Sequence, residues 1–197
     1  MRPFQSQVSM SGSKYLIIYG TKEGQTAKIA EQNGNFIREK SCDADVYDAR
    51  KIPRGLSIEP YVGVIVGSSL HYLRWSHKAA DFVVGQQPRI TTAQSAFFSV
   101  SMMASAPDDP KVIEELKKAS NKFFDATNWH PATVEHFAGG LAWSKYGFFT
   151  RYLMKAISYA QHKPVDTSKD QEFTNWDQVR KFAENFVERT RSEAPKS

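Results

Sequence analysis

The stretch that decides the fold is Tyr15 to Ala30, which reads YLIIYGTKEGQTAKIA. Its first five residues are apolar throughout, without the alternation typical of a strand that has one solvent-facing side. Such a run, bounded by Gly20, predicts a strand buried on both faces, and Thr26 to about Lys40 is predicted to be a helix. The loop between them therefore joins a buried strand directly to the start of a helix.

The loop from Gly20 to Thr26 has the features of an anion site. Its backbone N–H groups and the positive end of the following helix would converge on one point, which favours a phosphate dianion. No Gly-Lys-Ser/Thr closes the loop as in a Walker A sequence, and the Gly-x-Gly-x-x-Gly spacing of a dinucleotide fingerprint is absent. The loop therefore predicts a mononucleotide phosphate site, formed by Thr21, Lys22, Glu23, Gly24, Gln25 and Thr26.

Strands and helices alternate along the rest of the chain. Strands are predicted at residues 44–47, 62–66, 95–100 and 133–138, and helices at 76–84 and 110–126. A final helix is predicted to begin at Thr174, with Asp177 completing a variant of the capping box. Because two of the strands have no polar side, the sheet must be parallel and covered by helices on both faces. The predicted fold class is α/β, a three-layer sandwich around a five-stranded parallel sheet in the order 2-1-3-4-5.

The length of 197 residues fits one domain, predicted at residues 14–187 with an insertion at about 141–173. Residues 1–13 are predicted to be a disordered tail and residues 188–197 a C-terminal tail. No apolar run is long enough to span a membrane, and the N-terminus lacks the apolar core of a signal peptide. Cys42 is the single cysteine, so no internal disulfide is possible, and no metal-ligand spacing is present. A reducing compartment suits this composition.

The loop sequence resembles the FMN-phosphate signature of the flavodoxins, in which a buried apolar pair, an aromatic residue, Ser/Thr, a small residue, Thr and Ala stand at fixed spacing. From Lys14 to Val187 the chain also resembles the menaquinone-dependent protoporphyrinogen oxidases, a flavodoxin-like branch. The segments that carry this second resemblance are residues 21–26, 67–72, 95–100, 129–131, 138–141 and 174–179. The resemblance implies a flavodoxin-like fold, FMN as cofactor, and electron transfer from protoporphyrinogen IX to a respiratory quinone in heme biosynthesis.

The same resemblance implies that the flavin ring lies over the ends of the third and fourth strands. The residues expected to contact it are Ser68, Ser69, Leu70, His71, Tyr72, Trp75, Ser99, Val100 and Ser101. Tyr72 or Trp75 could stack on the ring, or each could pack against the following helix. His71 is a candidate proton donor, with a surface histidine as the alternative. No other catalytic residue is predicted, because the flavin carries the chemistry.

The predicted insertion is rich in aromatic and basic residues. Read as a helix, it has a basic side and an apolar side, a pattern that suits an interface with lipid. The residues expected to contact substrate or membrane are Trp143, Lys145, Tyr146, Arg151 and Lys155. The basic side could meet porphyrin propionates or an anionic membrane, and the apolar side a quinone. The alternative is an extra helix packed on the sheet edge, whereas nucleic-acid binding is disfavoured because no recognised motif accompanies the charge.

Three functions follow from these observations. The first is a flavin-dependent protoporphyrinogen IX dehydrogenase with a quinone acceptor, located in the cytoplasm or peripherally on the inner face of the membrane. The second is a diffusible flavodoxin-type electron carrier, which the net charge of +5 disfavours because such carriers are strongly acidic. The third is an FMN-dependent NAD(P)H:quinone reductase, which needs no distinctive nicotinamide motif.

Overall fold

The computed structural model describes residues 12–71, 74–141 and 171–193. Within them the strands are β1 (Lys14–Gly20), β2 (Asp43–Asp48), β3 (Gly63–His71), β4 (Arg74–Trp75), β5 (Ser95–Ser101), β6 (Thr133–Ala138), β7 (Gly140–Leu141) and β8 (Gln171–Glu172). The helices are α1 (Gln25–Glu39), α2 (His77–Gly85), α3 (Arg89–Thr92), the 3₁₀ turn η1 (Met103–Ser105), α4 (Pro110–Thr127) and α6 (Trp176–Ser192).

Five parallel strands form the central sheet in the order β2-β1-β3-β5-β6, which confirms the predicted order 2-1-3-4-5. Two smaller pairings were not predicted. β4 folds back antiparallel on the end of β3, and β7 pairs antiparallel with β8. β3 extends to His71, beyond the predicted end at Val66, so Ser68 to His71 belong to the strand itself and not to a loop after it.

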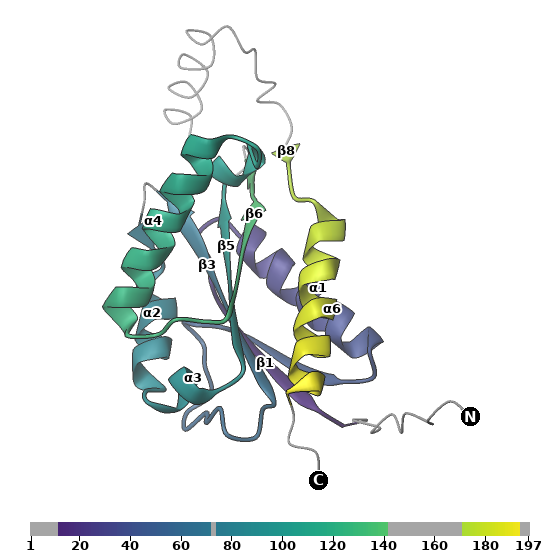
Figure 1. Ribbon diagram of the computed structural model, residues 1–197. Helices are drawn as coiled ribbons and strands as arrows, with labels where there is room; N and C mark the ends of the chain where they lie inside the picture. Colours follow the sequence, from purple (N-terminus) through teal and green to yellow (C-terminus); the bar gives the residue numbers. More distant parts are fainter. Residues whose placement is uncertain (1–11, 72–73, 142–170, 194–197) are drawn as a thin grey trace, which may run out of the picture.

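Helices cover both faces of the sheet, as Figure 1 shows, with α1 and α6 on one side and α2, α3 and α4 on the other. The alternation of side chains along β1 explains the continuous apolar run. Tyr15 and Ile17 face the α1 and α6 core, whereas Leu16 and Ile18 face the α2 and α4 core, and all four are fully buried. The prediction of a three-layer sandwich is confirmed.

Helix α1 runs through Asn33 and Gly34 without a break. A Cβ atom on Gly34 would lie only 2.8 Å from Cγ2 of Val46 in β2, so the glycine allows the helix to approach the sheet closely. The Asn33 side chain donates to the carbonyl of Ile29 one turn earlier, at 2.9 Å. Packing therefore offsets the low helix propensity of this pair.

The last helix begins and ends later than predicted. Asn175, not Thr174, caps α6, since its side chain accepts hydrogen bonds from the backbone N–H groups of Asp177 and Gln178. The helix then continues to Ser192, so the predicted C-terminal tail at residues 188–197 is wrong over its first five residues. Thr190 in this turn is 4% exposed, and such burial is incompatible with a tail.

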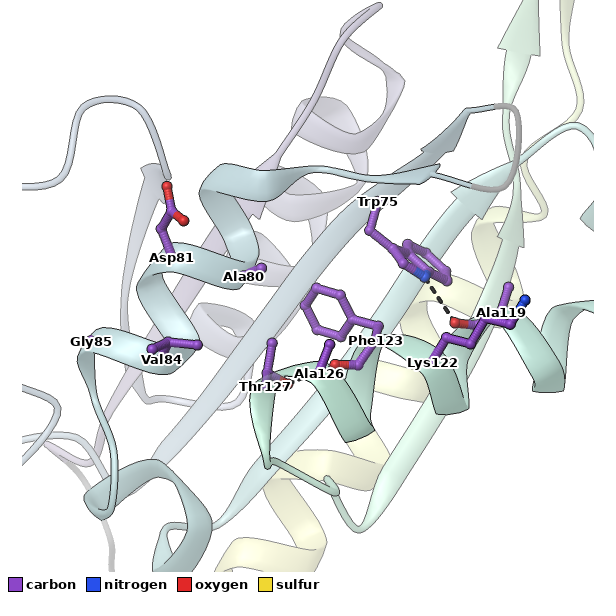
Figure 2. A pocket seen from close by; sticks show the side chains of 10 residues that line it. All are labelled: Trp75, Ala80, Asp81, Val84, Gly85, Ala119, Lys122, Phe123, Ala126 and Thr127. Carbon is purple, nitrogen blue, oxygen red and sulfur yellow. Dashed lines mark hydrogen bonds between the residues drawn. The ribbon is translucent and has the colours of Figure 1, made fainter.

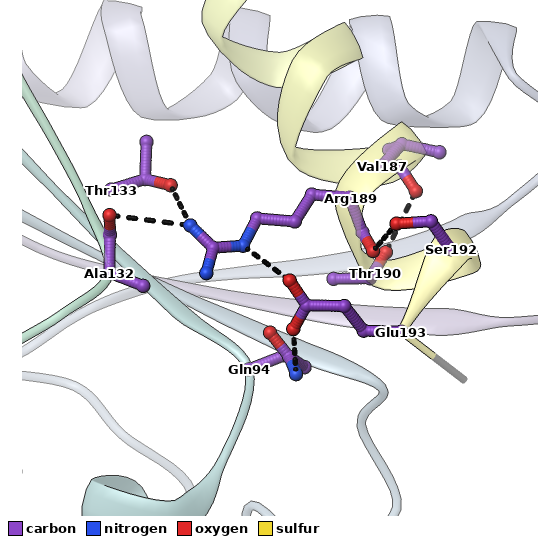
Figure 3. A network of polar contacts seen from close by, with 8 residues as sticks. All are labelled: Gln94, Ala132, Thr133, Val187, Arg189, Thr190, Ser192 and Glu193. Atoms are coloured by element: carbon purple, nitrogen blue, oxygen red, sulfur yellow. Dashed lines mark hydrogen bonds and ion pairs between the residues drawn. The ribbon is translucent and has the colours of Figure 1, made fainter. Parts of the chain in front are cut away.

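A polar network fixes this last turn of α6 to the sheet (Figure 3). Arg189 donates to the carbonyl of Ala132 and to the hydroxyl of Thr133, and it also pairs with Glu193 at 3.0 Å. Glu193 in turn accepts from the side chain of Gln94, just before β5. These contacts with residues far away in the sequence thus stabilise the end of α6, beyond the part of the helix that buried apolar side chains hold to the sheet.

Among the described residues no helix is both long and apolar enough to cross a membrane. In the same part of the chain, no group of His, Cys, Asp and Glu side chains is arranged to hold a metal ion. Cys42 is buried at 5% exposure beside the guanidinium of Arg191, whose Nη2 lies 3.3 Å from the sulfur.

Candidate functional site

The predicted phosphate loop connects β1 to α1 at the carboxyl edge of the sheet. Gly24 precedes the helix with φ +105°, and no side chain caps the first turn of α1, which also lacks an acidic residue. Within the loop, the N–H of Gly24 donates to the Thr21 hydroxyl at 3.0 Å. Backbone N–H groups at the start of α1 therefore have no capping carboxylate or hydroxyl to compete with an anion. This geometry fits a phosphate.

Close packing under the loop explains Gly20. A Cβ atom there would lie 2.1 Å from the hydroxyl oxygen of Ser76 and 2.4 Å from its Cβ, so only glycine is accommodated. Ser76 is in turn held by its backbone N–H, which donates to the Ser68 hydroxyl at 3.0 Å. The end of β1 is thus fixed against the start of α2. The phosphate loop follows β1 at the point where the strand order of the sheet reverses.

The hydroxyls predicted to face the flavin ring lie inside the protein. Ser68, Ser99 and Ser101 are all buried, and each makes a hydrogen bond within the chain. Ser69, Leu70 and Val100 are also buried, at 5 to 8% exposure. The side chains of these residues therefore pack within the carboxyl edge of the sheet. Backbone groups at the ends of β3 and β5 are better placed than the buried hydroxyls to contact a flavin ring.

His71 is a predicted ring-site residue that lies beside the phosphate loop. Its Nε2 is 3.7 Å from Oε1 of Glu23, so the end of β3 and the loop after β1 approach each other. The structure thus brings together two residues that were predicted separately, one for the ring and one for the phosphate. Tyr72, the other candidate for stacking, lies outside the described residues.

Trp75 packs among the helices on the α2 and α4 side of the sheet and does not face the phosphate loop. Its indole N–H donates to the carbonyl of Ala119 in α4 at 2.9 Å, and its ring contacts Phe97 and Phe123 edge-on. Trp75 lines a cavity of about 440 Å³ between α2 and α4, whose lining side chains are drawn in Figure 2. Of the two roles considered for Trp75, the structure favours packing, with its indole N–H bonded to α4.

The sequence interpretation missed Thr174 as part of this site. Its hydroxyl accepts from the Gln25 side chain at 2.8 Å and donates to the carbonyl of Ala138 at 2.8 Å. The sequence interpretation assigned Thr174 to a helix cap, and a local pattern carries no signal for a contact across 149 residues. The predicted contacts Trp143, Lys145, Tyr146, Arg151 and Lys155 lie outside the described residues.

His136 is a second residue that the sequence did not indicate. It lies on β6 opposite Ser99, and its Nδ1 shares a hydrogen bond of 2.6 Å with the Ser99 hydroxyl. Burial lowers the pKa of His136 below its ordinary value of 6.5, so the imidazole is neutral at pH 7. The pair stabilises the sheet edge beneath the proposed ring site as a neutral hydrogen bond.

The pKa of His136 predicts a pH-dependent loss of stability. The unfolded chain takes up a proton on this histidine below about pH 6.5, whereas the folded protein resists doing so. The stabilisation is therefore complete above pH 6.5 and is lost as the pH falls toward the lowered folded pKa, by at most about 1.4 kcal/mol per pH unit.

Urea unfolding between pH 7.5 and 5.5 should show a steeper loss of stability for the wild type than for His136→Asn. His77→Asn, at an exposed histidine, should keep the wild-type slope, and equal slopes in all three proteins would contradict the assignment.

A parallel sheet of this order, with an uncapped anion loop after its first strand, defines the flavodoxin-like class of mononucleotide-binding proteins. The flavodoxin domain family model matches residues 16–168, and the chain belongs to that family. Among solved structures, oxidised flavodoxin 1 from Bacillus cereus has a TM-score of 0.51 and 17% identity, over 89% of this chain and 98% of that one. FMN is the cofactor of this family, which the uncapped first turn of α1 fits.

Two relatives carry a more specific name. Protoporphyrinogen IX dehydrogenase [quinone] from Escherichia coli strain K12 is 29% identical over 177 residues, which are 90% of this chain and 96% of that protein. The protein of the same name from Leishmania major is 29% identical over 178 residues, covering 88% of this chain and 74% of that one. With the family, these relatives make the chain an FMN flavoprotein oxidoreductase.

Proposed function

We propose that this chain is a protoporphyrinogen IX dehydrogenase that uses FMN and passes electrons to a respiratory quinone. The observation that carries the proposal is the similarity to the E. coli and L. major enzymes over about nine-tenths of the chain. The 177 matched residues extend over more of the chain than the span 16–168 of the general flavodoxin match.

The proposed FMN phosphate site is the loop from Thr21 to Thr26. The uncapped N–H groups of the first turn of α1 donate to the phosphate, and the Thr21 hydroxyl holds Gly24 in the required turn. When bound, FMN supplies a two-electron acceptor for the porphyrinogen and a donor for the quinone. The chain's task is then to bind the phosphate, orient the ring at the ends of β3 and β5, and exclude water.

His71 remains our candidate for a proton-handling group beside the ring. Its Nε2 faces the Glu23 carboxylate at 3.7 Å, which places the imidazole beside the phosphate loop. The same pair holds the His71 side chain at the edge of the proposed ring site. Tyr72 is retained as the proposed stacking residue.

Charge supports this function over the electron-carrier alternative. The net charge of +5 suits a tetrapyrrole with propionate groups and an anionic membrane surface that holds the quinone. We propose a peripheral position at the inner face of the membrane. Its contacts would be the basic and aromatic residues Trp143, Lys145, Tyr146, Arg151 and Lys155.

Anaerobic turnover tests the proposal. The FMN-loaded protein is mixed with protoporphyrinogen IX, and the flavin absorbance and the porphyrin fluorescence are followed together. We expect the flavin to bleach while porphyrin forms, and a menaquinone analogue in vesicles to restore the flavin spectrum. Vesicles with anionic lipid should support faster reoxidation than neutral vesicles, because the protein is basic. A mock reaction with free FMN in place of the protein controls for spontaneous oxidation.

The two alternative functions, a nicotinamide-dependent quinone reductase and an electron carrier, predict different results in the same assay. Bleaching by NADPH, with no response to the porphyrinogen, would replace the proposal with a nicotinamide-dependent quinone reductase. Reduction only through a flavodoxin reductase would indicate an electron carrier. Equal reoxidation with neutral and anionic vesicles would contradict the proposed membrane position without affecting the porphyrinogen reaction.

A further inference from the structure

The first turn of α1 is fixed from outside the phosphate loop. Gly24 has a backbone conformation that favours glycine, and no side-chain cap holds the helix start in place. The hydrogen bond from the Gly24 N–H to Thr21 orders the loop internally, but it does not fix Gln25, the first residue of the helix. Since phosphate binding depends on where the first backbone N–H groups lie, another contact must restrain them.

A side-chain relay supplies that restraint. The Gln25 amide donates to the Thr174 hydroxyl at 2.8 Å, and that hydroxyl donates to the carbonyl of Ala138 at 2.8 Å. The single O–H of Thr174 is thereby directed at Ala138, which leaves its oxygen free to accept from Gln25. The relay joins the start of α1 to the end of β6 through a residue that belongs to neither.

The backbone around Thr174 is itself held to the sheet. The N–H of Phe173 donates to the carbonyl of Gly139, and the N–H of Gly139 donates to the carbonyl of Ser101, each at 3.0 Å. A Cβ atom on Gly140 would lie 2.9 Å from the carbonyl oxygen of Gln171, so the β7 and β8 strands are closely apposed there. Thr174 is therefore a fixed point from which the Gln25 side chain is positioned.

We propose that Thr174 and Gln25 are positioning residues of the phosphate site. Thr174 acts through the Gln25 side chain to hold the backbone N–H groups of Gln25 and Thr26 in the orientation that binds the FMN phosphate. The neighbouring ion pair of Lys28 with Glu172, at 3.1 Å, is too exposed to provide this restraint. The inference rests on the FMN site and not on the porphyrinogen reaction, so it can fail or hold independently of the substrate.

Titration of the apoprotein with FMN and with riboflavin, which lacks the phosphate, tests the relay. Thr174→Val removes the hydroxyl at nearly constant volume and should raise the Kd for FMN by about tenfold. The Kd for riboflavin should stay within about twofold, because the ring site is not altered. Thr174→Ser keeps the hydroxyl and should restore FMN affinity. Thr91→Val breaks another Thr–Gln hydrogen bond, from Thr91 to Gln87 at 2.6 Å, and should leave both affinities unchanged.

Gln25→Met provides a second route if Thr174→Val unfolds the protein. It removes the amide while Thr174 keeps its bond to Ala138, and it should weaken FMN binding to the same extent. The double variant should lose no more than either single variant, because the two residues act as one unit. The proposal is overturned if FMN affinity is unchanged in both variants, if riboflavin affinity falls equally, or if Thr174→Ser behaves like Thr174→Val.

Discussion

Gly24→Asp is expected to purify without flavin and to show FMN affinity reduced on the order of a thousandfold. The new carboxylate would lie at the start of α1, where the phosphate dianion binds in our account. Two unit charges about 4 Å apart repel by about 4 kcal/mol at an effective dielectric constant near 20, which is about three powers of ten in Kd. Fluorescence titration of the refolded apoprotein with FMN measures the change.

Gly55→Asp is the matched control for Gly24→Asp. Gly55 also has a positive φ, +76°, and a Cβ atom there would meet nothing within 4 Å. It therefore reproduces the backbone strain and the added charge at a site without a predicted ligand. Flavin content should be that of the wild type. Normal FMN binding by Gly24→Asp would show that the phosphate is bound elsewhere.

Phe97→Ala should reduce the free energy of unfolding by about 3–5 kcal/mol, the typical cost of deleting a buried phenyl ring. Phe97 is fully buried on β5 and lies at the centre of the α2 and α4 core. Its ring stacks on Phe123 at 5.2 Å between centroids and meets Phe124, Trp75 and Trp129 edge-on. Neighbouring rings on several elements cannot all collapse into the space, so a cavity should remain.

Urea unfolding of the apoprotein measures this loss. Val84→Ala is the control, because Val84 is 53% exposed on α2 and its truncation should change stability by no more than about 0.5 kcal/mol. If Phe97→Ala lost less than about 1 kcal/mol, the aromatic cluster would not be the packed core that the contacts indicate.

The fold could be predicted because its strongest signals are local. Tyr15–Tyr19 and Val62–Val66 are apolar without alternation, a pattern that only a doubly covered parallel sheet explains in a chain of this composition. The helical spacing of Val179, Phe182, Ala183 and Phe186, which are buried on one side of α6, is a local signal of the same kind. Gly20 and Gly24 identified the phosphate loop because glycine is needed at each for a local reason, a close contact or a positive φ.

The features that the sequence did not predict depend on contacts between residues far apart in the chain. The role of Thr174 is set by Gln25 and Ala138, and the end of α6 is set by Ala132, Thr133 and Gln94. Trp75 follows β3 closely enough to suggest a ring contact, yet β4 pairs antiparallel with β3 and the Trp75 indole bonds to α4. Periodicity reports which side of an element is buried, but it does not report which neighbour covers it.

The most direct test of the account is the ratio of the dissociation constants of the apoprotein for riboflavin and FMN. If the loop from Thr21 to Thr26 binds the phosphate, two or more charge-assisted hydrogen bonds should make FMN bind at least about a hundredfold more tightly. In Gly24→Asp this preference should disappear. Equal affinity of the wild type for the two flavins would contradict the assignment of the loop as the phosphate site.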